Sequence, residues 1–193
     1  QGADGDLARP DRMIATLKHF AGYGLSQAGR DYAAVEASPA TLMRIMEPFR
    51  AGIAAGAGAV MVAFSTINDL PATAHPVLLQ DILRRRFGFD GLIVTDFTAI
   101  DPELVHHGIA ADAREAAYLA FKAGVTVDLV SNAFLTHLEP LVEEGRRAPD
   151  ARAFGPVTEA EITERCRLVL AAKYRLGLFD DPYLGLDAPR RQQ

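Results

Sequence analysis

The segment Gly91-Leu92-Ile93-Val94-Thr95-Asp96-Phe97 decides which fold we expect for this chain. An apolar run follows a glycine and ends on a carboxylate beside an aromatic ring. Such an unbroken run is typical of a strand that is buried on both faces. An acid at the carboxyl end of such a strand lies where α/β proteins place their chemistry. Asp96 could equally cap the next helix, so the segment alone leaves both interpretations open.

Three other apolar runs have the same form, and helical patterns separate them. The runs are Met13 to Phe20, Ala57 to Phe64 and Gly124 to Val130. Helix-start signals occur between them, at Ser38-Pro39, Pro76 and Asp112, and a later capping box at Thr158 to Glu161 begins another helix. The spacing of the strand ends fits βα units. We therefore predict an α/β fold of four parallel βα units, half of a (β/α)8 barrel of the TIM type, with a C-terminal helix.

The predicted domain limits follow from these runs. We expect a flexible N-terminal segment at 1–12, the half-barrel at 13–179 and a poorly ordered tail at 180–193. The start at Gln1 has no Met and no apolar stretch, and is neither a signal peptide nor a translation start. We expect the chain to be a processed product or a fragment.

Composition narrows the class of protein. The 193 residues are 49% hydrophobic and 23% charged, with a net charge of −5, as in an ordinary globular domain. No basic stripe predicts a nucleic-acid partner, and no apolar run approaches the roughly 18 residues of a membrane span. The single cysteine, Cys166, excludes an internal disulfide. Its place on an apolar helical stripe predicts a buried small side chain.

Polar residues that could bind a ligand or act in catalysis lie at the predicted strand ends. Lys18 and His19 end the first strand, and Asp96 ends the third. The carboxyl ends of barrel strands open on one face, so we expect these side chains to converge. The cations would bind sugar oxygens and keep Asp96 ionised. An ionised carboxylate can attack an anomeric carbon, whereas Phe64 and Phe97 offer apolar faces to a sugar ring. The alternative is a structural Lys-His pair that closes the barrel top.

Several ordered strings resemble the β-glucosidases of glycoside hydrolase family 3, in the second half of their N-terminal (β/α)8 barrel. The strings are Lys18-His19-Phe20-Ala21-Gly22-Tyr23-Gly24, Gly29-Arg30-Asp31-Tyr32, Gly58 to Phe64, Phe87-Gly88-Phe89-Asp90-Gly91, Val94-Thr95-Asp96 and Lys173 to Tyr183. A lone Lys-His or Thr-Asp pair would be a weak signal, but the ordered set is specific.

The resemblance implies a role for each candidate residue and an O-glycoside hydrolase activity without a cofactor or a metal ion. Asp96 matches the nucleophile of a retaining mechanism. The residues that match sugar-binding positions are Lys18, His19, Arg30, Met61, Phe64 and Phe97. Phe97 stands where the family often has Trp, so the wall of the sugar site is smaller and lacks the indole donor. The implied substrate is a β-linked glucoside or oligosaccharide, and the implied location is periplasmic or secreted.

The chain also departs from the family pattern. The family's barrel has four more strands before this point, and its general acid/base comes from a later domain. Asp101, Glu103 and Asp128 lie on loops of the same face, but nothing marks any of them as that acid. We therefore expect an incomplete, weakly active unit. It should pair with its missing barrel half and a C-terminal domain, or self-associate, because an open half-barrel exposes strand edges.

Two other functions remain open on the residues alone. One is a non-catalytic module that binds sugar or assembles half-barrels. The other is an aldolase-like barrel in which Lys18 forms a Schiff base. His106 and His107 are adjacent, so their side chains diverge, and no third ligand stands at a suitable spacing. We interpret them as loop histidines at the rim of the site, with no metal.

Overall fold

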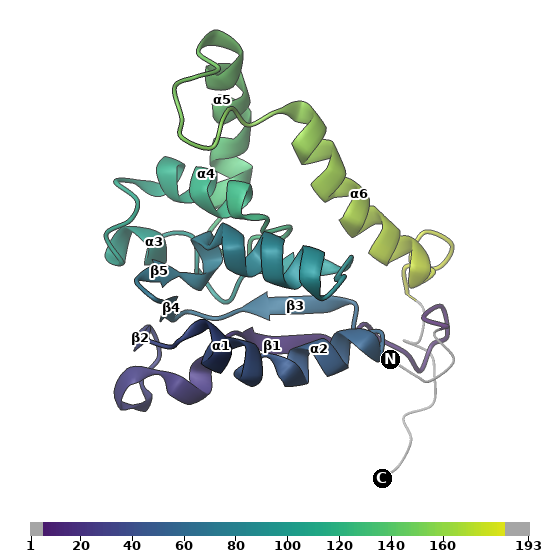
Figure 1. The fold of residues 1–193 in the computed structure, drawn as a ribbon. Coiled ribbons are helices and arrows are strands. Elements are labelled where there is room, and N and C mark those ends of the chain that lie inside the picture. The colour runs from purple at the N-terminus through teal and green to yellow at the C-terminus, as the bar shows by residue number, and fades with distance from the viewer. Residues whose placement is uncertain (1–5, 184–193) are drawn as a thin grey trace.

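The computed structural model describes residues 6–183 and centres on a parallel sheet. Its strands are β1 (Thr16–Phe20), β3 (Ala59–Val62) and β6 (Leu92–Val94), in the order β1-β3-β6. Both neighbouring pairs are parallel. Each strand lies inside a run that the sequence predicts to be a strand (Figure 1). The α/β class with a parallel sheet is confirmed.

The glycine that opens the deciding segment allows a close approach at the start of β6. A Cβ atom at Gly91 would lie 2.3 Å from the carbonyl oxygen of Gly58. That carbonyl accepts a hydrogen bond from the Leu92 N–H at 2.9 Å. A side chain at Gly91 would therefore push β6 away from the segment that leads into β3.

The fourth predicted strand is reduced to one parallel bridge, between Val94 and Val127. Two threonine hydroxyls replace backbone carbonyls in this part of the ladder. The Ile93 N–H donates to Oγ1 of Thr126 at 3.2 Å, and the Leu129 N–H donates to Oγ1 of Thr95 at 2.8 Å. Because side chains take these ladder positions, no regular strand forms. The four-unit half-barrel in its predicted form is therefore not confirmed.

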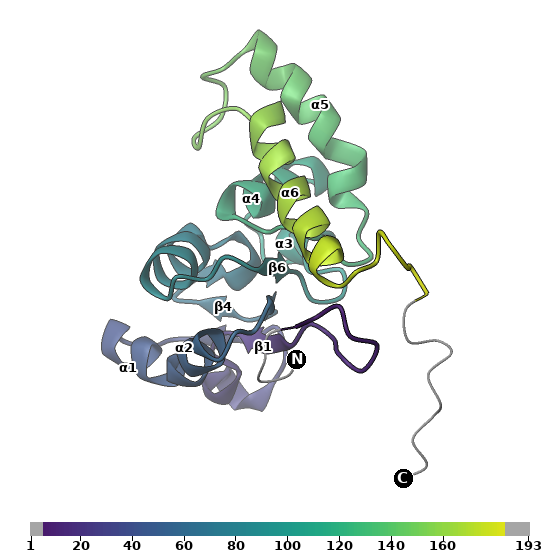
Figure 2. The same cartoon turned by 90° about the vertical axis from the view of Figure 1, so that its right-hand side faces the viewer.

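Helices pack around the sheet, with the N-terminal helices near β1 and the later ones on the side of β6 (Figures 1 and 2). They are α1 (Pro39–Ile45), α2 (Glu47–Ala54), η4 (Val77–Arg86), α3 (Glu103–His106), α4 (Ala113–Ala123), α5 (Ala133–Arg147) and α6 (Glu159–Arg175), with short turns η1 (Tyr23–Leu25), η2 (Gln27–Gly29) and η3 (Ala72–Ala74). In both views α1 and α2 lie beside β1, whereas α4 lies between the sheet and α5.

The predicted helix starts hold, with one interruption. The side chains of Ser38, Asp112 and Thr158 each accept a backbone N–H three residues later, as N-caps do. The helix expected after Ser38 is divided at Met46 into α1 and α2. Pro48 explains the division, because proline has no N–H and its ring crowds the carbonyl four residues earlier.

A small second sheet, which the sequence did not predict, stands at the carboxyl end of the main one. In it β2 (Ala34–Val35) pairs in parallel with β4 (Thr66–Ile67), which pairs antiparallel with β5 (Leu70–Pro71). Asn68 locks this sheet, because its side-chain amide both accepts from and donates to the backbone of Ala37, at 3.0 and 3.1 Å. The loop after β1 is thereby fixed to the loop after β3.

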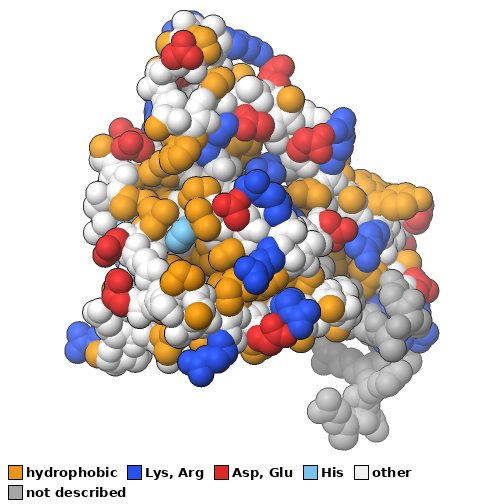
Figure 3. All heavy atoms as spheres, in the orientation of Figure 1, with side chains coloured by type: hydrophobic (Ala, Val, Ile, Leu, Met, Phe, Trp, Pro, Cys, Tyr) orange, Lys and Arg blue, Asp and Glu red, His pale blue; other side chains and the backbone are white. Residues whose placement is uncertain are grey.

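The prediction that Cys166 is buried is wrong, since its side chain is exposed. The apolar stripe of α6 borders an open hollow of about 350 Å³, whose other side comes from α4 and α5. Leu170, on the same stripe, is 49% exposed. Figure 3 shows apolar side chains at several places on the surface of the face seen in Figure 1, interspersed with charged ones. The helical period predicted the stripe correctly, but the described residues leave it half covered.

The predicted domain limits stay predictions. The ends of the proposed N-terminal segment and tail, residues 1–5 and 184–193, lie outside the described residues. Among residues 6–183, no helix is long and apolar enough to cross a membrane.

Candidate active site

The structure brings His19 and Asp96 together, although 77 positions separate them in the sequence. Nε2 of His19 lies 3.1 Å from Oδ2 of Asp96. His19 belongs to β1, and Asp96 follows the last residue of β6 by two positions. Because β1 and β6 flank β3 in parallel, their carboxyl ends place both side chains at one end of the sheet.

Asp96 is a partly enclosed carboxylate with both oxygens engaged. Its side chain is 17% exposed, and Oδ1 accepts the Phe97 N–H at 2.7 Å. The next helix, α3, has Pro102 as its N-cap residue, so Asp96 does not cap it. The capping alternative left open by the sequence is therefore wrong.

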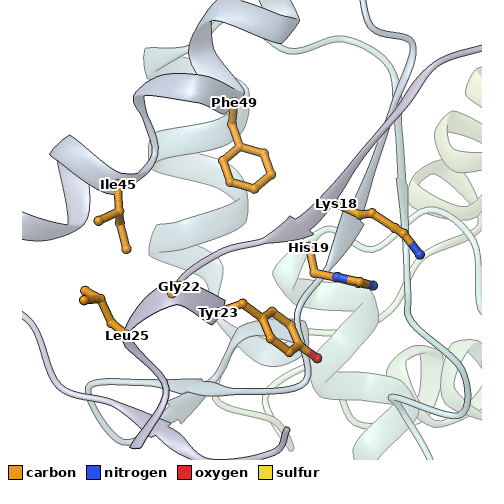
Figure 4. A pocket seen from close by; sticks show the side chains of 8 residues that line it. Lys18, His19, Gly22, Tyr23, Leu25, Ile45 and Phe49 are labelled. Carbon is orange, nitrogen blue, oxygen red and sulfur yellow. The ribbon is translucent and has the colours of Figure 1, made fainter. Parts of the chain in front are cut away.

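Lys18 and His19 present their side chains in the same direction. The peptide bond between them is cis. Figure 4 shows both side chains on one side of the strand, with Tyr23 beside His19. They form the polar wall of a hollow of about 270 Å³, and Ile45 and Phe49 line its apolar wall. Asp96 does not line this hollow, so the hollow flanks the carboxylate–imidazole pair.

Tyr23 supports His19 in a way that the sequence did not predict. The two ring centroids are 5.0 Å apart, with the ring planes tilted by 47°. Desolvation is the main cause that raises the pKa of Tyr23 to about 12, and the Asp31 and Asp96 carboxylates add to the rise. The phenol therefore stays neutral at physiological pH and keeps its proton. Its place in the Lys18–Gly24 string was the sequence signal that could have identified it.

The other predicted sugar-binding residues differ in how they are placed. Met61 is half-buried in β3, where it pairs with Val94 of β6. Phe64 follows β3 by two residues and is half-buried, whereas Phe97 is 62% exposed beside Asp96. Arg30 is exposed just after η2, and within residues 6–183 its guanidinium forms no ion pair. Among the described residues, Arg30 therefore has no ion pair with Asp96.

Two further residues contact Phe64: Tyr32, which the sequence analysis did not assign to the site, and His107. The ring of Tyr32 lies 4.5 Å from that of Phe64, centroid to centroid. Nε2 of His107 lies 3.3 Å from the carbonyl oxygen of Phe64, which places this histidine at the rim as the sequence suggested. The family-like string that ends on Tyr32 was the available signal for that residue.

His106 and His107, at the carboxyl end of α3, lie near the Glu103 carboxylate. Oε1 of Glu103 lies 3.8 Å from Nδ1 of His106, and Oε2 lies 3.9 Å from Nε2 of His107. Within the described part of the chain, no group of three or more His, Cys, Asp or Glu side chains could hold a metal ion.

The parallel sheet with its polar residues at the carboxyl ends defines a barrel-type α/β domain. Residues 2–171 match the family model described as the glycosyl hydrolase family 3 N terminal domain. The chain is 41% identical over 172 residues to a periplasmic β-glucosidase of Salmonella typhimurium, and the match covers 89% of this chain and 21% of that protein. The chain therefore belongs to glycosyl hydrolase family 3.

Solved structures agree with this assignment. A β-glucosidase from Listeria innocua in complex with glucose superposes with a TM-score of 0.85 at 34% identity, over 96% of this chain and 25% of that one. A mutant of that enzyme in complex with laminaribiose gives a TM-score of 0.87 at 33% identity, over 98% of this chain and 25% of that one. The chain spans about a fifth to a quarter of the length of these relatives.

Proposed function

We propose that this chain is the part of a retaining β-glucosidase that carries the catalytic nucleophile, Asp96. The observation that carries the proposal is the contact of 3.1 Å between the Asp96 carboxylate and the His19 imidazole at the end of the parallel sheet. A carboxylate that is partly enclosed, contacts the His19 imidazole and accepts the Phe97 N–H is suited to attack an anomeric carbon.

The neighbouring groups suit a sugar in front of Asp96. Lys18 and His19 can donate hydrogen bonds to the hydroxyl oxygens of a sugar. Met61, Phe64 and Phe97 offer apolar faces to the ring, and Arg30 completes the set of proposed sugar-binding residues. The relatives are named β-glucosidases and β-xylosidases, and one β-glucosidase is described with bound glucose and a mutant of it with laminaribiose. We infer a β-linked glucoside or oligosaccharide as the substrate.

We propose that the general acid/base comes from outside residues 6–183. A retaining mechanism needs a second carboxyl group about 5–5.5 Å from the nucleophile. Asp128 is engaged elsewhere, since it accepts hydrogen bonds from the Ser131 hydroxyl and the Phe134 N–H. Glu103 lies between His106 and His107. The chain alone should then be weakly active and complete its site with a further barrel half and domain, or by self-association.

The named location of the Salmonella relative supports a periplasmic or secreted protein. The aldolase alternative receives no support, because Lys18 is an exposed residue within β1, whereas a Schiff-base lysine is activated by desolvated surroundings.

The test is the substitution Asp96→Gly in the natural polypeptide, assayed with an aryl β-glucoside. Turnover should fall at least about a thousandfold, because the attacking group is lost, while glucose binding by calorimetry remains. Azide should restore turnover in this variant and give the glycosyl azide of inverted configuration, because a small anion can attack in place of the carboxylate.

Asp150→Asn, in a surface loop, is the matched control and should retain full turnover. Unchanged turnover in Asp96→Gly would refute the assignment of the nucleophile. Glucose binding without turnover in the unsubstituted protein would instead identify a non-catalytic sugar-binding module. Ordinary turnover by this chain alone as a monomer would refute its proposed incompleteness.

A further inference from the structure

His107 is a largely enclosed histidine to which the proposed chemistry gives no role. Only 15% of its side chain is exposed, and its Nε2 lies 3.3 Å from the carbonyl oxygen of Phe64. A carbonyl oxygen only accepts hydrogen bonds, so Nε2 carries the proton in this contact. Phe64 follows β3, and His107 follows α3, 43 positions later in the chain. The contact therefore joins segments that follow two different strands of the sheet.

The Phe64 carbonyl needs this partner, because it lies just beyond the ladder of the main sheet. One residue earlier, the Ala63 N–H still donates to the carbonyl of Phe20, the last residue of β1, at 2.7 Å. Within residues 6–183, no backbone N–H pairs with the Phe64 carbonyl. A carbonyl that leaves the ladder at a half-buried position costs free energy unless another donor meets it. His107 supplies that donor.

His107 can hold this carbonyl in place, because α3 is itself anchored in the core. Ile100, just before α3, is fully buried, and Leu104 within it is 1% exposed. The His107 N–H donates to the carbonyl of Glu103 at 2.9 Å, which fixes the backbone at the end of the helix. Oε2 of Glu103 lies 3.9 Å from Nε2 of His107, so the proton on this nitrogen also faces a carboxylate.

The segment that carries His107 starts at the candidate nucleophile. Asp96 follows β6, and α3 begins seven positions later at Glu103. The Ala99 N–H donates to the carbonyl of Asp96 at 3.3 Å, and Ala99 is 2% exposed, so a buried turn connects the two. The contact of His107 with Phe64 therefore sets the position of the loop after β3 relative to the segment that carries Asp96.

Other sides of Phe64 meet the loop after β1. The Tyr32 ring lies 4.5 Å from the Phe64 ring, centroid to centroid. The Tyr23 hydroxyl lies near the Phe64 backbone, whose hydrogen bonding works against the rise in the pKa of that phenol. Phe64 thus lies between the loop after β1 and the end of α3, and His107 is its contact on the α3 side.

We propose that His107 is a positioning residue that holds Phe64 against the sugar that Asp96 attacks. This inference rests on the proposed function. An aromatic face binds a sugar ring well only at a matching distance and tilt, so a shift of the Phe64 backbone weakens the contact. The attacking carboxylate is oriented by other groups, the His19 imidazole and the Phe97 N–H, so its reactivity should not depend on His107.

The experiment measures kcat and KM of the natural polypeptide with an aryl β-glucoside. His107→Leu removes the donor at a similar volume, whereas His107→Gln keeps an N–H donor at a similar reach. His106→Leu is the matched control, because His106 is the adjacent histidine, also lies near Glu103, at 3.8 Å, and is 67% exposed. His107→Leu is also combined with Phe64→Ala, in which no ring remains to be positioned.

In His107→Leu, KM should rise about fivefold while kcat changes by less than about twofold, because the hydrogen bond that holds Phe64 is lost. His107→Gln should restore most of the original KM, and His106→Leu should keep it. In Phe64→Ala, the further change His107→Leu should raise KM by less than about twofold, since His107 acts through the ring. A purely structural histidine would instead lower the melting temperature and the active fraction, and leave KM unchanged.

Three results would overturn the positioning role and leave the proposed function intact. One is an unchanged KM in His107→Leu. Another is a KM raised equally in His107→Gln, because the donor would then not matter. The third is a rise in KM that is as large in Phe64→Ala as in the parent, because His107 would then act without the ring. If the unsubstituted polypeptide does not turn over the glucoside, the proposed function fails, and the positioning role fails with it.

Discussion

Two regions of the molecule contain partly exposed side chains: the carboxyl ends of the strands around His19 and Asp96, and the apolar stripe of α6 around Cys166 and Leu170. They differ in whether these side chains have specific polar partners. At the strand ends, polar groups meet specific partners, such as His19 and Asp96 at 3.1 Å. Along α6, Cys166 and Leu170 border an open hollow and have no such partners in the described part of the chain. The conformation at the strand ends depends on contacts between individual residues, whereas the α6 region depends on a helical repeat of apolar residues.

The comparison shows that a segment of this domain can have a well-defined conformation without being buried. Hydrogen-bond partners such as the Thr95 hydroxyl and the Leu129 N–H, at 2.8 Å, fix the strand-end face locally. The conformation of α6 is fixed by its own caps, but its burial depends on what packs against it. Substitutions that compare the two regions should therefore have unequal effects.

The largest contrast should come from two helical leucines. Leu83 on η4 is fully buried, and Leu170 on α6 is 49% exposed. Leu83→Ala should lower the free energy of unfolding by about 3 kcal/mol, because it leaves a cavity, and Leu170→Ala by less than about 1 kcal/mol. Denaturant unfolding measures both. Equal losses would show that the α6 stripe is covered in solution and would remove the distinction between the regions.

The next effect concerns the hydroxyl that replaces a ladder carbonyl. Thr95 is fully buried, and its Oγ1 accepts the Leu129 N–H. Thr95→Val should cost about 2 kcal/mol, because a buried donor loses its partner, whereas Thr95→Ser should restore most of that loss. Thr163→Val, at an exposed position on α6, should change stability by no more than about 0.5 kcal/mol. A Thr95→Val protein as stable as the control would show that the hydroxyl is dispensable.

A smaller effect is expected at the start of α6, where the capping box joins Thr158 and Glu161. Thr158→Ala should cost about 1 kcal/mol, and Thr158→Ser should retain the cap. Hydrogen exchange of the Glu161 amide, which the Thr158 hydroxyl accepts at 3.2 Å, should accelerate in the alanine variant. Unaltered exchange would mean that packing and not the cap orders the first turn.

At neutral pH the smallest effect is expected at Tyr23, which changes stability only under alkaline conditions. The folded state raises the pKa of this phenol from 10.0 to about 12, so it keeps a proton that the unfolded chain loses. The resulting stabilisation is fully present below pH 10 and is lost as the pH rises towards about 12. Tyr23→Phe should therefore flatten the fall of the melting temperature in this range. Tyr174→Phe serves as the control, and an equally flat profile there would refute the explanation.

Much of the fold could be predicted from local sequence. The runs that contain Ile93 and Val60 predicted strands, and the caps at Asp112 and Thr158 predicted where helices start. The division at Met46 was missed, although Pro48 was visible in the sequence. The prediction of a regular fourth strand was not confirmed. An apolar run does not reveal that the Thr95 and Thr126 hydroxyls will accept backbone N–H groups in place of carbonyl oxygens.

The candidate site was predictable in part, through the strings around Lys18, His19 and Asp96. The support from Tyr23 and the pair of Tyr32 with Phe64 were not predicted, because they depend on the loops after β1 and β3 meeting. Two short strands of two residues each carry that meeting. Segments so short have no periodic signal in a sequence.

The sequence by itself determined the class of fold, the helix starts and the residues at the strand ends, because apolar period, capping and motif order act over a few neighbouring positions. The convergence of Asp96 and His19 was expected from the strand ends, but tertiary structure alone set their distance of 3.1 Å and decided that Asp96 does not cap a helix. It also decided that Tyr32 stacks on Phe64 and that Cys166 is exposed. These outcomes depend on contacts between segments far apart in the chain, whose geometry is set only when the sheet and its covering helices pack together.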